Sequence, residues 1–248
     1  MKKLLNWRLL LGVFLILLSA QLYLLHYIIF HDTHHIFIYL LGDIAFVPVE
    51  VLIVTLIIHQ LLEKREKRNL LRKLNMLVGA FYSDVGTELL RIFTGFDPNI
   101  EQLRVKLKVD NKWSAEKFEE MKVFLKKYSY DVDSRTGDLD ELRDFLSTKT
   151  GFLLNLLANP NLLEHESFTE LLWAIFHLAE ELGKREDFST LPALDLDHIS
   201  GDIKRAYKTL SLQWLDYTQH LKKEYPYLFS LAVRSNPFEL APSAVIAD

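Results

Sequence analysis

The feature that most constrains this chain is an apolar run at residues 36–62 that passes without a break into a charged segment at residues 63–73. Another apolar run, at residues 9–30, precedes it. A helix of about 20 apolar residues crosses the hydrocarbon core of a bilayer, and both runs reach that length. We therefore expect two membrane spans, at about residues 9–30 and 36–62.

The first run also has features of a cleavable signal peptide. Lys2 and Lys3 precede it, and residues 19–21 (Ser-Ala-Gln) resemble a cleavage site. However, Leu18 is too large for the small-residue position before Ala20, and the apolar run continues for about ten residues beyond this point. We therefore interpret residues 9–30 as a span that is retained in the mature protein.

Basic residues flank the two runs asymmetrically. The connection at residues 31–35 (His-Asp-Thr-His-His) contains no Lys or Arg, whereas Lys2, Lys3 and Arg8 precede the first run. Six basic residues follow the second run: Lys64, Arg65, Lys67, Arg68, Arg72 and Lys73. Because cytoplasmic flanks carry the excess of Lys and Arg, we expect both termini in the cytoplasm and a multi-pass protein of the inner (plasma) membrane. These six residues are also candidates for binding anionic lipid headgroups, at about 1 kcal/mol each near the surface.

Charge and composition narrow the classes of partner and chemistry. The net charge of −4 belongs to the residues after the spans, because the first 59 residues hold three basic and three acidic side chains. This mild charge does not indicate a nucleic-acid partner. The chain has no cysteine, which excludes disulfides, thiolate nucleophiles and thiolate metal sites. Since no Gly-rich phosphate loop or nucleophile elbow is visible either, we expect a protein that is not an enzyme and holds no cofactor.

The pattern after the second run predicts a helix that continues into a soluble domain. Leu70, Leu74, Leu77 and Phe81 recur at spacings of four, three and four residues. Such a seam packs either within the chain or against a second copy of it. The Gly and Pro at residues 94–98 (Thr-Gly-Phe-Asp-Pro) predict the end of this helix.

Four segments follow from this pattern. We expect a transmembrane hairpin at residues 1–62 and a basic juxtamembrane helix at residues 63–95. A cytoplasmic helical bundle at residues 96–235 and a tail at residues 236–248 complete the chain. The predicted fold class is therefore all-α, a two-helix transmembrane hairpin followed by a cytoplasmic helical bundle.

The bundle is expected to contain five or six helices. Its predicted helices cover residues 114–128, 138–158, 167–182, 197–225 and about 226–234. In the third of them, Ser167 and Glu170 form a capping box. A lone strand at residues 103–109 is a less favoured alternative to helix, because a single strand has no sheet to join. Aromatic residues at helical spacing are expected in the core: Trp173, Phe176, Trp214, Tyr217 and Phe229.

Four residues stand out within the spans: His26, Asp43, Pro48 and Glu50. Asp43 and Glu50 are seven residues apart and share one helix face. A carboxylate at the centre of a span costs about 2.5–3.5 kcal/mol, so this face is not expected to meet lipid. In one interpretation the hairpin folds back and His26 pairs with Asp43. In the other, several copies stack the carboxylates as acidic rings around a cation pathway, and Pro48 kinks the helix that lines it.

Two further groups of residues are candidate metal ligands. The turn between the spans gathers imidazoles and a carboxylate, at His31, Asp32, His34 and His35. A role as interfacial polar residues explains them more simply. In the bundle, helix faces carry His177 with Glu180 and Glu181, and Asp216 with His220. These do not match the paired Glu-x-x-His signature of di-iron bundles, and solvated charged faces account for them.

The second span and the segment after it carry a resemblance to known proteins. Residues 41–46 (Leu-Gly-Asp-Ile-Ala-Phe) and 61–68 (Leu-Leu-Glu-Lys-Arg-Glu-Lys-Arg) resemble the corresponding part of uncharacterised prokaryotic two-span membrane proteins with a helical cytoplasmic domain. The resemblance covers the second span and the segment that follows it, about a fifth of the chain. It implies a shared architecture and no catalytic residue.

The sequence leads to two functional hypotheses. The first is a non-enzymatic integral membrane protein whose cytoplasmic helical domain binds a partner or ligand, for anchoring, sensing or scaffolding. The second is a homo-oligomeric cation channel with Asp43 and Glu50 in its pore. Membrane lipids, further copies of the chain and a protein partner of the bundle are the expected partners, and nucleic acid is not.

Overall fold

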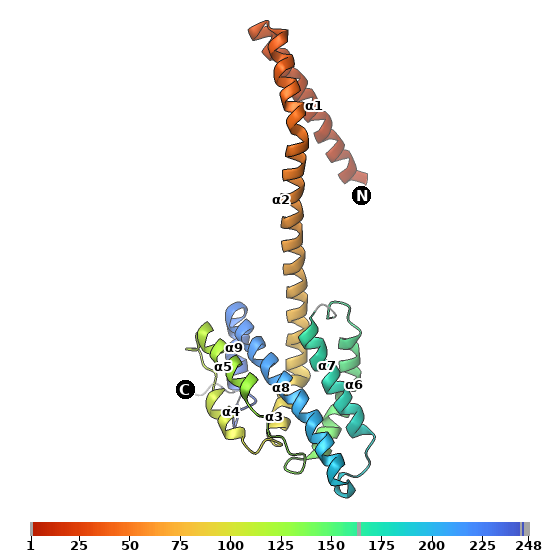
Figure 1. The fold of residues 1–248 in the computed structure, drawn as a ribbon, viewed down its shortest axis with the longest axis vertical. Coiled ribbons are helices and arrows are strands. Elements are labelled where there is room, and N and C mark those ends of the chain that lie inside the picture. Colours follow the sequence, from red (N-terminus) through yellow and green to blue (C-terminus); the bar gives the residue numbers. More distant parts are fainter. Residues whose placement is uncertain (1, 163–164, 244, 246–248) are drawn as a thin grey trace. The chain divides into compact units, whose positions relative to one another are not determined.

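The computed structural model describes residues 2–162, 165–243 and 245. Every regular element in these residues is a helix, which confirms the all-α prediction for the described chain (Figure 1). The longer helices are α1 (Lys2–Phe30), α2 (Thr33–Phe81), α5 (Ala115–Lys127), α6 (Leu139–Leu157), α7 (Glu166–Gly183) and α8 (Ala193–Glu224). Shorter elements are the π-helix η1 (Tyr82–Gly86), α3 (Thr87–Thr94), α4 (Ile100–Lys106), the 3-10 helix η2 (Phe188–Thr190) and α9 (Pro226–Arg234).

The chain divides into two compact units after Lys67. The first unit contains α1 and the first part of α2, which meet at His31 and Asp32. His31 has a left-handed φ of 53°. The Oδ1 atom of Asp32 accepts a 3.1 Å hydrogen bond from the backbone N–H of His35. Because this bond satisfies one of the unpaired N–H groups at the start of a helix, Asp32 caps α2.

Exposed apolar side chains run along both helices of the first unit, from Leu9 to Phe30 and from Phe37 to Leu62. Both helices are long and apolar enough to cross a membrane, and none of their most apolar stretch is buried (0%). The exposed fraction reaches 71% at Ile16 and at Leu41. A helix that is apolar all round normally lies inside a large core or in a bilayer, and the residues of the first unit whose burial is described form no such core.

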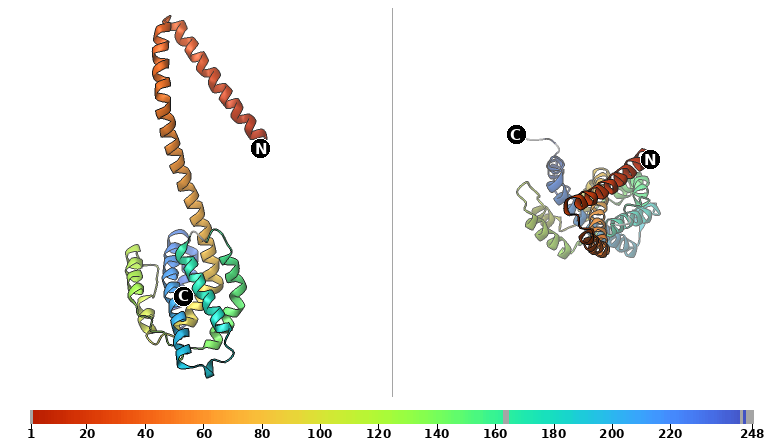
Figure 2. Two further views of the ribbon diagram at one scale, coloured as in Figure 1. Left: turned by 45° about the vertical axis from the view of Figure 1, so that its right-hand side comes forward. Right: turned by 90° about the horizontal axis from the view of Figure 1, so that it is seen from above.

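The second unit, residues 68–248, is a helical domain organised around α8 (Figure 2). α8 packs against α3, α5, α7 and α9 and also contacts η1. Buried positions follow one another along it at spacings of three and four residues, as at Ile199, Ile203, Ala206 and Leu210. Because these and further buried residues occupy more than one face, α8 forms the centre of the domain.

The end of α2 contributes to the core of this domain. Leu74 and Phe81 are buried, and Leu70 and Leu77 are partly buried against the same core. The heptad-like seam therefore packs within the chain, which agrees with the first of its two interpretations. A contact between copies of the chain would need a different surface.

A π-helical segment, η1, separates α2 from α3. The carbonyl oxygen of Tyr82 accepts hydrogen bonds from the backbone N–H and, at 2.8 Å, the hydroxyl of Thr87. At Gly86, a Cβ atom would lie 2.6 Å from Cδ1 of Tyr82 and 2.7 Å from Cε1 of Phe81. Glycine is therefore needed here, because two aromatic rings lie directly against the backbone.

Two helix starts agree with the prediction. The hydroxyl of Ser114 accepts the N–H of Lys117 at 3.3 Å and caps α5. The carboxylate of Asp138 accepts the N–H of Glu141 at 2.9 Å and caps α6. Each cap supplies an acceptor for an N–H group that has no helical partner, which fixes where the helix begins.

The alternative of a strand at residues 103–109 is wrong, because α4 occupies the start of this segment. Leu103 and Leu107 lie four residues apart and are both fully buried (0%), whereas Val105 is 75% exposed. The apolar positions that alternate in the sequence are therefore split between core and solvent. A short alternating pattern is compatible with a helical turn as well as with a strand. Here the burial of Leu103 and Leu107, four residues apart, fits a helix.

The capping box predicted at Ser167 and Glu170 is not formed. α7 begins at Glu166, and its cap is His165, whose Nδ1 atom accepts the N–H of Phe168 at 3.3 Å. The Ser167 hydroxyl instead accepts a 2.9 Å hydrogen bond from Nε2 of Gln213. The helix starts earlier than expected, because a histidine ring nitrogen acts as the acceptor.

One of the five aromatic residues expected in the core lies on the surface. Trp214 and Phe229 are buried at 3% exposure, and Phe176 and Tyr217 are partly buried. Trp173, in contrast, is 57% exposed. Its side chain is on the face of α7 that packs on neither α6 nor α8, the two helices that α7 contacts most.

Candidate functional site

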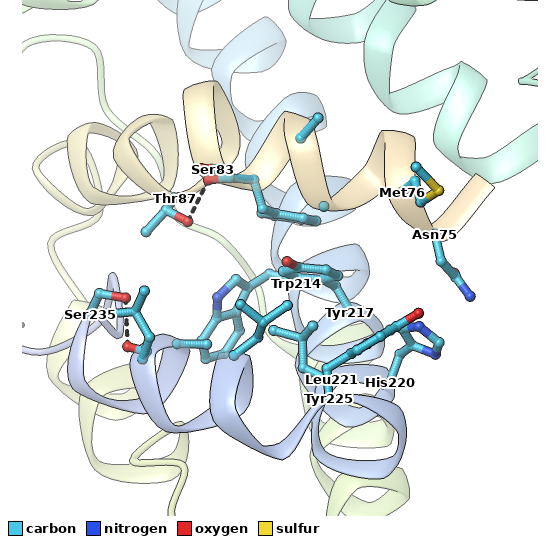
Figure 3. A pocket seen from close by; sticks show the side chains of 16 residues that line it. Asn75, Met76, Ser83, Thr87, Trp214, Tyr217, His220, Leu221, Tyr225 and Ser235 are labelled. Carbon is cyan, nitrogen blue, oxygen red and sulfur yellow. Dashed lines mark hydrogen bonds between the residues drawn. The ribbon is translucent and has the colours of Figure 1, made fainter. Parts of the chain in front are cut away.

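A pocket in the second unit lies between two walls of the helical domain (Figure 3). The end of α2 and η1 form one wall, and α8 and α9 form the facing wall. The pocket has a volume of about 540 Å³. Small-molecule sites in proteins measure roughly 300–1,000 Å³, so the pocket has the size of a ligand site.

No charged side chain of the described chain lines this pocket. Apolar residues such as Met76, Leu221 and Leu231 form much of its surface. Its hydrogen-bonding side chains are uncharged or, for histidine, neutral: Asn75, Tyr82, Ser83, Thr87, Trp214, Tyr217, His220, Tyr225 and Ser235. Among the described residues, the lining has no Lys or Arg to pair with a phosphate, and no carboxylate or second histidine to join His220 in holding a metal ion. It therefore suits an uncharged, mainly apolar molecule.

Tyr82 and Tyr217 join the two walls. Their rings stack with centroids 4.8 Å apart and planes 11° from parallel. The Tyr82 hydroxyl donates a 3.1 Å hydrogen bond to the backbone carbonyl of Leu210, and burial raises the pKa of Tyr82 well above its usual value. Beside them, a Cβ atom at Gly79 would lie 3.5 Å from the Tyr217 hydroxyl. The absence of a side chain at Gly79 therefore keeps this part of the pocket open.

His220 gives the pocket an unsatisfied polar atom. Its Nε2 atom is buried and has no hydrogen-bond partner within the described residues. Its ring meets that of Tyr225 edge-on, with centroids 5.8 Å apart. Burial lowers the pKa of His220 below its usual value of 6.5, so the ring is neutral at pH 7. A neutral imidazole nitrogen can donate to or accept from an uncharged ligand, depending on the tautomer.

Two of the polar residues predicted within the spans lie close together in the first unit. His26 and Asp43 line a pocket of about 550 Å³, with Tyr23 and Tyr39 among its other residues. No hydrogen bond or ion pair joins His26 to Asp43, and the Nδ1 atom of His26 is buried without a hydrogen-bond partner in the described chain. The structure therefore brings the two residues to one pocket without pairing them.

Pro48 and Glu50 lie further along the same helix. Pro48 is inside α2, where it cannot donate to the carbonyl oxygen of Ile44. Asp43 and Glu50 are exposed, and neither forms a hydrogen bond or an ion pair with another described residue. Their carboxylates are thus available to water or to another chain.

The candidate metal ligands of the turn are not brought together in the structure. Asp32 caps α2, and the ring of His35 stacks on that of His26 with centroids 6.0 Å apart. The ligand atoms of His31, Asp32, His34 and His35 do not converge, and in the described residues the convergent set of His and Asp atoms is on α7 and α8.

The remaining predicted residues are found on helix surfaces. The six candidates for lipid headgroups, on α2, are exposed and form no ion pair with described residues: Lys64, Arg65, Lys67, Arg68, Arg72 and Lys73. Their lipid role stays a prediction. Asp216 pairs with Lys122, with Oδ1 and Nζ 2.6 Å apart, while His220 lines the pocket, so these two do not form a metal pair.

Sequence reasoning did not find the pocket. Trp214 and Tyr217 were expected to be core residues, and both contribute to a wall instead of filling the space completely. A signal was present in the adjacent small residues Gly79 and Ala80, which lie opposite these aromatic rings. Small residues facing large ones leave room, but the sequence does not show which helices face one another.

Comparison with known proteins places both units in one family. A family model described as the MJ1433 N-terminal helical domain matches residues 2–62, and one described as the C-terminal helical domain of uncharacterized protein MJ1433 matches residues 70–234. The chain belongs to the MJ1433 family. Uncharacterized protein MJ1433 of Methanocaldococcus jannaschii is 48% identical over 234 residues, which are 94% of each chain. No solved structure matches the chain significantly. The resemblance to a family of uncharacterised helical proteins is thus confirmed.

Proposed function

We propose that this MJ1433-family chain is a non-enzymatic integral membrane protein whose C-terminal helical domain binds an uncharged, mainly apolar ligand. The hairpin of α1 and the first part of α2 is the anchor. The pocket between α2–η1 and α8–α9 is the binding site. The two parts of the proposal rest on different observations and are tested separately.

The anchor is supported by the exposure of apolar side chains along α1 and α2. Ile16 and Leu41 are each 71% exposed, and the most apolar stretches of both helices have no buried residue. Burying one large aliphatic side chain stabilises by about 1.5–3 kcal/mol, so leaving dozens of them in water would cost tens of kcal/mol. Soluble monomers rarely expose apolar patches of more than a few hundred Å². A bilayer covers this surface along its whole length.

The orientation follows from the basic residues. Lys2, Lys3 and Arg8 precede the first span, and the six from Lys64 to Lys73 follow the second, whereas the turn has none. The positive-inside rule then places both termini in the cytoplasm and the turn outside. The binding domain is cytoplasmic in this arrangement, and the basic segment lies where anionic headgroups are found.

The anchor is tested by extraction of the membranes of cells that express the full chain. An integral protein stays in the pellet after washing with alkaline carbonate and leaves only with detergent. We expect the chain in the pellet. A variant with Asp substituted at Ile16 and Ile53 in the middle of each run should insert less well, because each Asp costs about 2.5–3.5 kcal/mol there. Release of the wild-type chain by carbonate would contradict the anchor.

The binding site is supported by the uncharged lining of the pocket and by the unpartnered Nε2 atom of His220. Gly79 offers the test, because a larger side chain there meets Tyr217 and fills the space. We expect native mass spectrometry of the full chain in detergent to show a bound small molecule that Gly79→Leu removes. Gly151→Ala, at a helix position with open space around it, is the matched control. A ligand retained by Gly79→Leu would place binding elsewhere.

A homo-oligomeric cation channel is the second candidate. It is favoured by Asp43 and Glu50, which share one face of α2 and have no hydrogen-bond or ion-pair partner among the described residues. Carboxylates inside a span face water or another chain, and a ring of copies provides both. The doubly neutralised variant Asp43→Asn, Glu50→Gln should abolish cation flux into vesicles. Unchanged flux, or a monomeric particle in nanodiscs, would exclude this candidate.

A further inference from the structure

Two adjacent helices of the C-terminal domain each present a pair of candidate metal ligands four residues apart. α7 carries His177 and Glu181, and α8 carries His198 and Asp202. Residues four apart lie on one helix face, and α7 and α8 pack directly on each other. The four side chains therefore meet at one place between the two helices, away from the pocket described above.

The distances within this cluster fit metal coordination. The Nε2 atoms of His177 and His198 each lie 3.4 Å from Oδ2 of Asp202. The three ligand atoms lie within 4.8 Å of one another. Tetrahedral ligands at about 2.1 Å from a zinc ion are roughly 3.4 Å apart, so an ion fits among these atoms with little movement.

One of the two oxygens of the buried Asp202 carboxylate has no hydrogen-bond partner among the described residues. Asp202 is 2% exposed, and its Oδ2 atom is buried without a hydrogen bond in the described chain. Neither imidazole donates to that oxygen, although both are close to it. Its other oxygen, Oδ1, accepts from Arg205 at 2.9 Å. A buried oxygen without a partner is destabilising, and a cation bound at Oδ2 would satisfy it.

The neighbours of the cluster match the surroundings of known metal sites. Arg205 orients Asp202 through the oxygen that faces away from the imidazoles, as outer residues orient metal ligands. The side chains of His177 and His198 are 44% and 54% exposed, which gives an ion a path from solvent. Glu181 lies 4.0 Å from His198 but forms an ion pair with Arg185. Water would therefore occupy the fourth position around a bound ion.

We propose that His177, His198 and Asp202 bind one divalent transition-metal ion, with Zn²⁺ as the best match. Two neutral imidazoles and one carboxylate are a donor set that Zn²⁺ prefers. The site joins α7 to α8 and is independent of the membrane anchor and of the ligand pocket.

The test is calorimetric titration of the full chain, purified in detergent without a polyhistidine tag and stripped of metal, with ZnCl₂. We expect one Zn²⁺ per chain. Replacing ligands, in Asp202→Asn or in the double variant His177→Ala, His198→Ala, should weaken binding by more than about 100-fold. Arg205→Ala removes an outer contact and should weaken it by about 10–100-fold. In wild type, bound Co²⁺ should show the visible bands of a tetrahedral ion, and these should be absent from Asp202→Asn.

The matched control is the double variant His34→Ala, His35→Ala, which removes the other histidine cluster and should bind Zn²⁺ as wild type does. Circular dichroism in EDTA checks that each variant is folded. If Asp202→Asn does not fold, the double variant His177→Ala, His198→Ala tests the proposal instead. The side chains of His177 and His198 are half-exposed, so their replacement should leave the fold intact. Equal Zn²⁺ affinity in wild type and in the folded ligand variants would overturn the proposal. Loss of binding in His34→Ala, His35→Ala would also overturn it.

Discussion

Tyr82 of η1 stacks on Tyr217 of α8 with ring centroids 4.8 Å apart, and this contact joins the two walls of the pocket. The Tyr82 hydroxyl extends the contact by donating to the backbone of Leu210. The same residue therefore sets the spacing of the walls and anchors one of them. Tyr82 therefore contributes both to the stability of the domain and to the shape of the pocket.

Removal of the Tyr82 hydroxyl should destabilise the domain. Tyr82→Phe keeps the ring but loses a buried hydrogen bond, so we expect the free energy of unfolding to fall by about 1 kcal/mol. The control is Tyr207→Phe, because the buried Tyr207 hydroxyl has no hydrogen-bond partner within the described chain. Its removal should leave the free energy of unfolding unchanged or higher. Urea denaturation followed by circular dichroism measures both, and equal losses would contradict the assignment.

Two glycines should respond to alanine in opposite directions. At Gly86 the new Cβ atom would lie 2.6 Å from Tyr82, so Gly86→Ala should cost about 1–3 kcal/mol through overpacking. At Gly151, inside α6, no atom lies within 4 Å of the new Cβ. Gly151→Ala should therefore stabilise by about 1 kcal/mol, the usual gain in a helix interior. Thermal melting of the two variants checks the signs, and a Gly86→Ala variant that is as stable as wild type would argue against the packing of the two rings at η1.

His220 should make the stability of the domain depend on pH. Its folded-state pKa is lowered by burial, so the unfolded state binds more protons than the folded state as pH falls through about 6.5. The contribution of His220 is complete above its unfolded pKa and is lost as pH falls toward its folded pKa. We compare wild type with His220→Gln at about pH 7.5 and about pH 5.5, either side of the usual histidine pKa.

The expected result is a larger acid-induced loss of stability in wild type than in His220→Gln, which keeps a polar side chain but does not titrate. His34→Gln is the control for histidine replacement in general, since the His34 side chain is exposed and does not line the pocket. If the free energy of unfolding depends on pH in the same way in wild type and in His220→Gln, the pKa of His220 is not lowered by burial.

Local patterns in the sequence predicted most of the fold. Ser114 was recognised as a helix cap, because a side-chain oxygen before an apolar-periodic run satisfies a free N–H, and a helix start near residue 138 was expected from the periodicity alone. The start of α7 was missed, because the acceptor there is the ring of His165, which is not a usual cap. The exposed Trp173 was missed as well, because periodicity alone does not tell which face of α7 meets α6 and α8.

The sites depend on contacts between helices that the sequence does not give. His177 belongs with His198 and Asp202 of the next helix, across a chain separation of more than 20 residues that no motif spacing reports. The spacing of four residues between His198 and Asp202 is compatible with two metal ligands on one helix face. This spacing is common in helices, and it indicates a metal site only when His177 of α7 is known to lie beside them. The pocket likewise needs Gly79 of α2 to face Tyr217 of α8.

The measurement that tests the membrane hairpin most directly is labelling of single cysteines with a membrane-impermeant maleimide, since the chain has no cysteine of its own. We introduce cysteine at Ile16, Thr33 or Ser147, all exposed in the structure. We expect labelling of Thr33→Cys in intact cells and of Ser147→Cys only after lysis. We expect no labelling of Ile16→Cys without detergent, although this side chain is 71% exposed, because lipid covers it in the proposed hairpin. Labelling of Ile16→Cys in lysates without detergent would contradict the membrane hairpin.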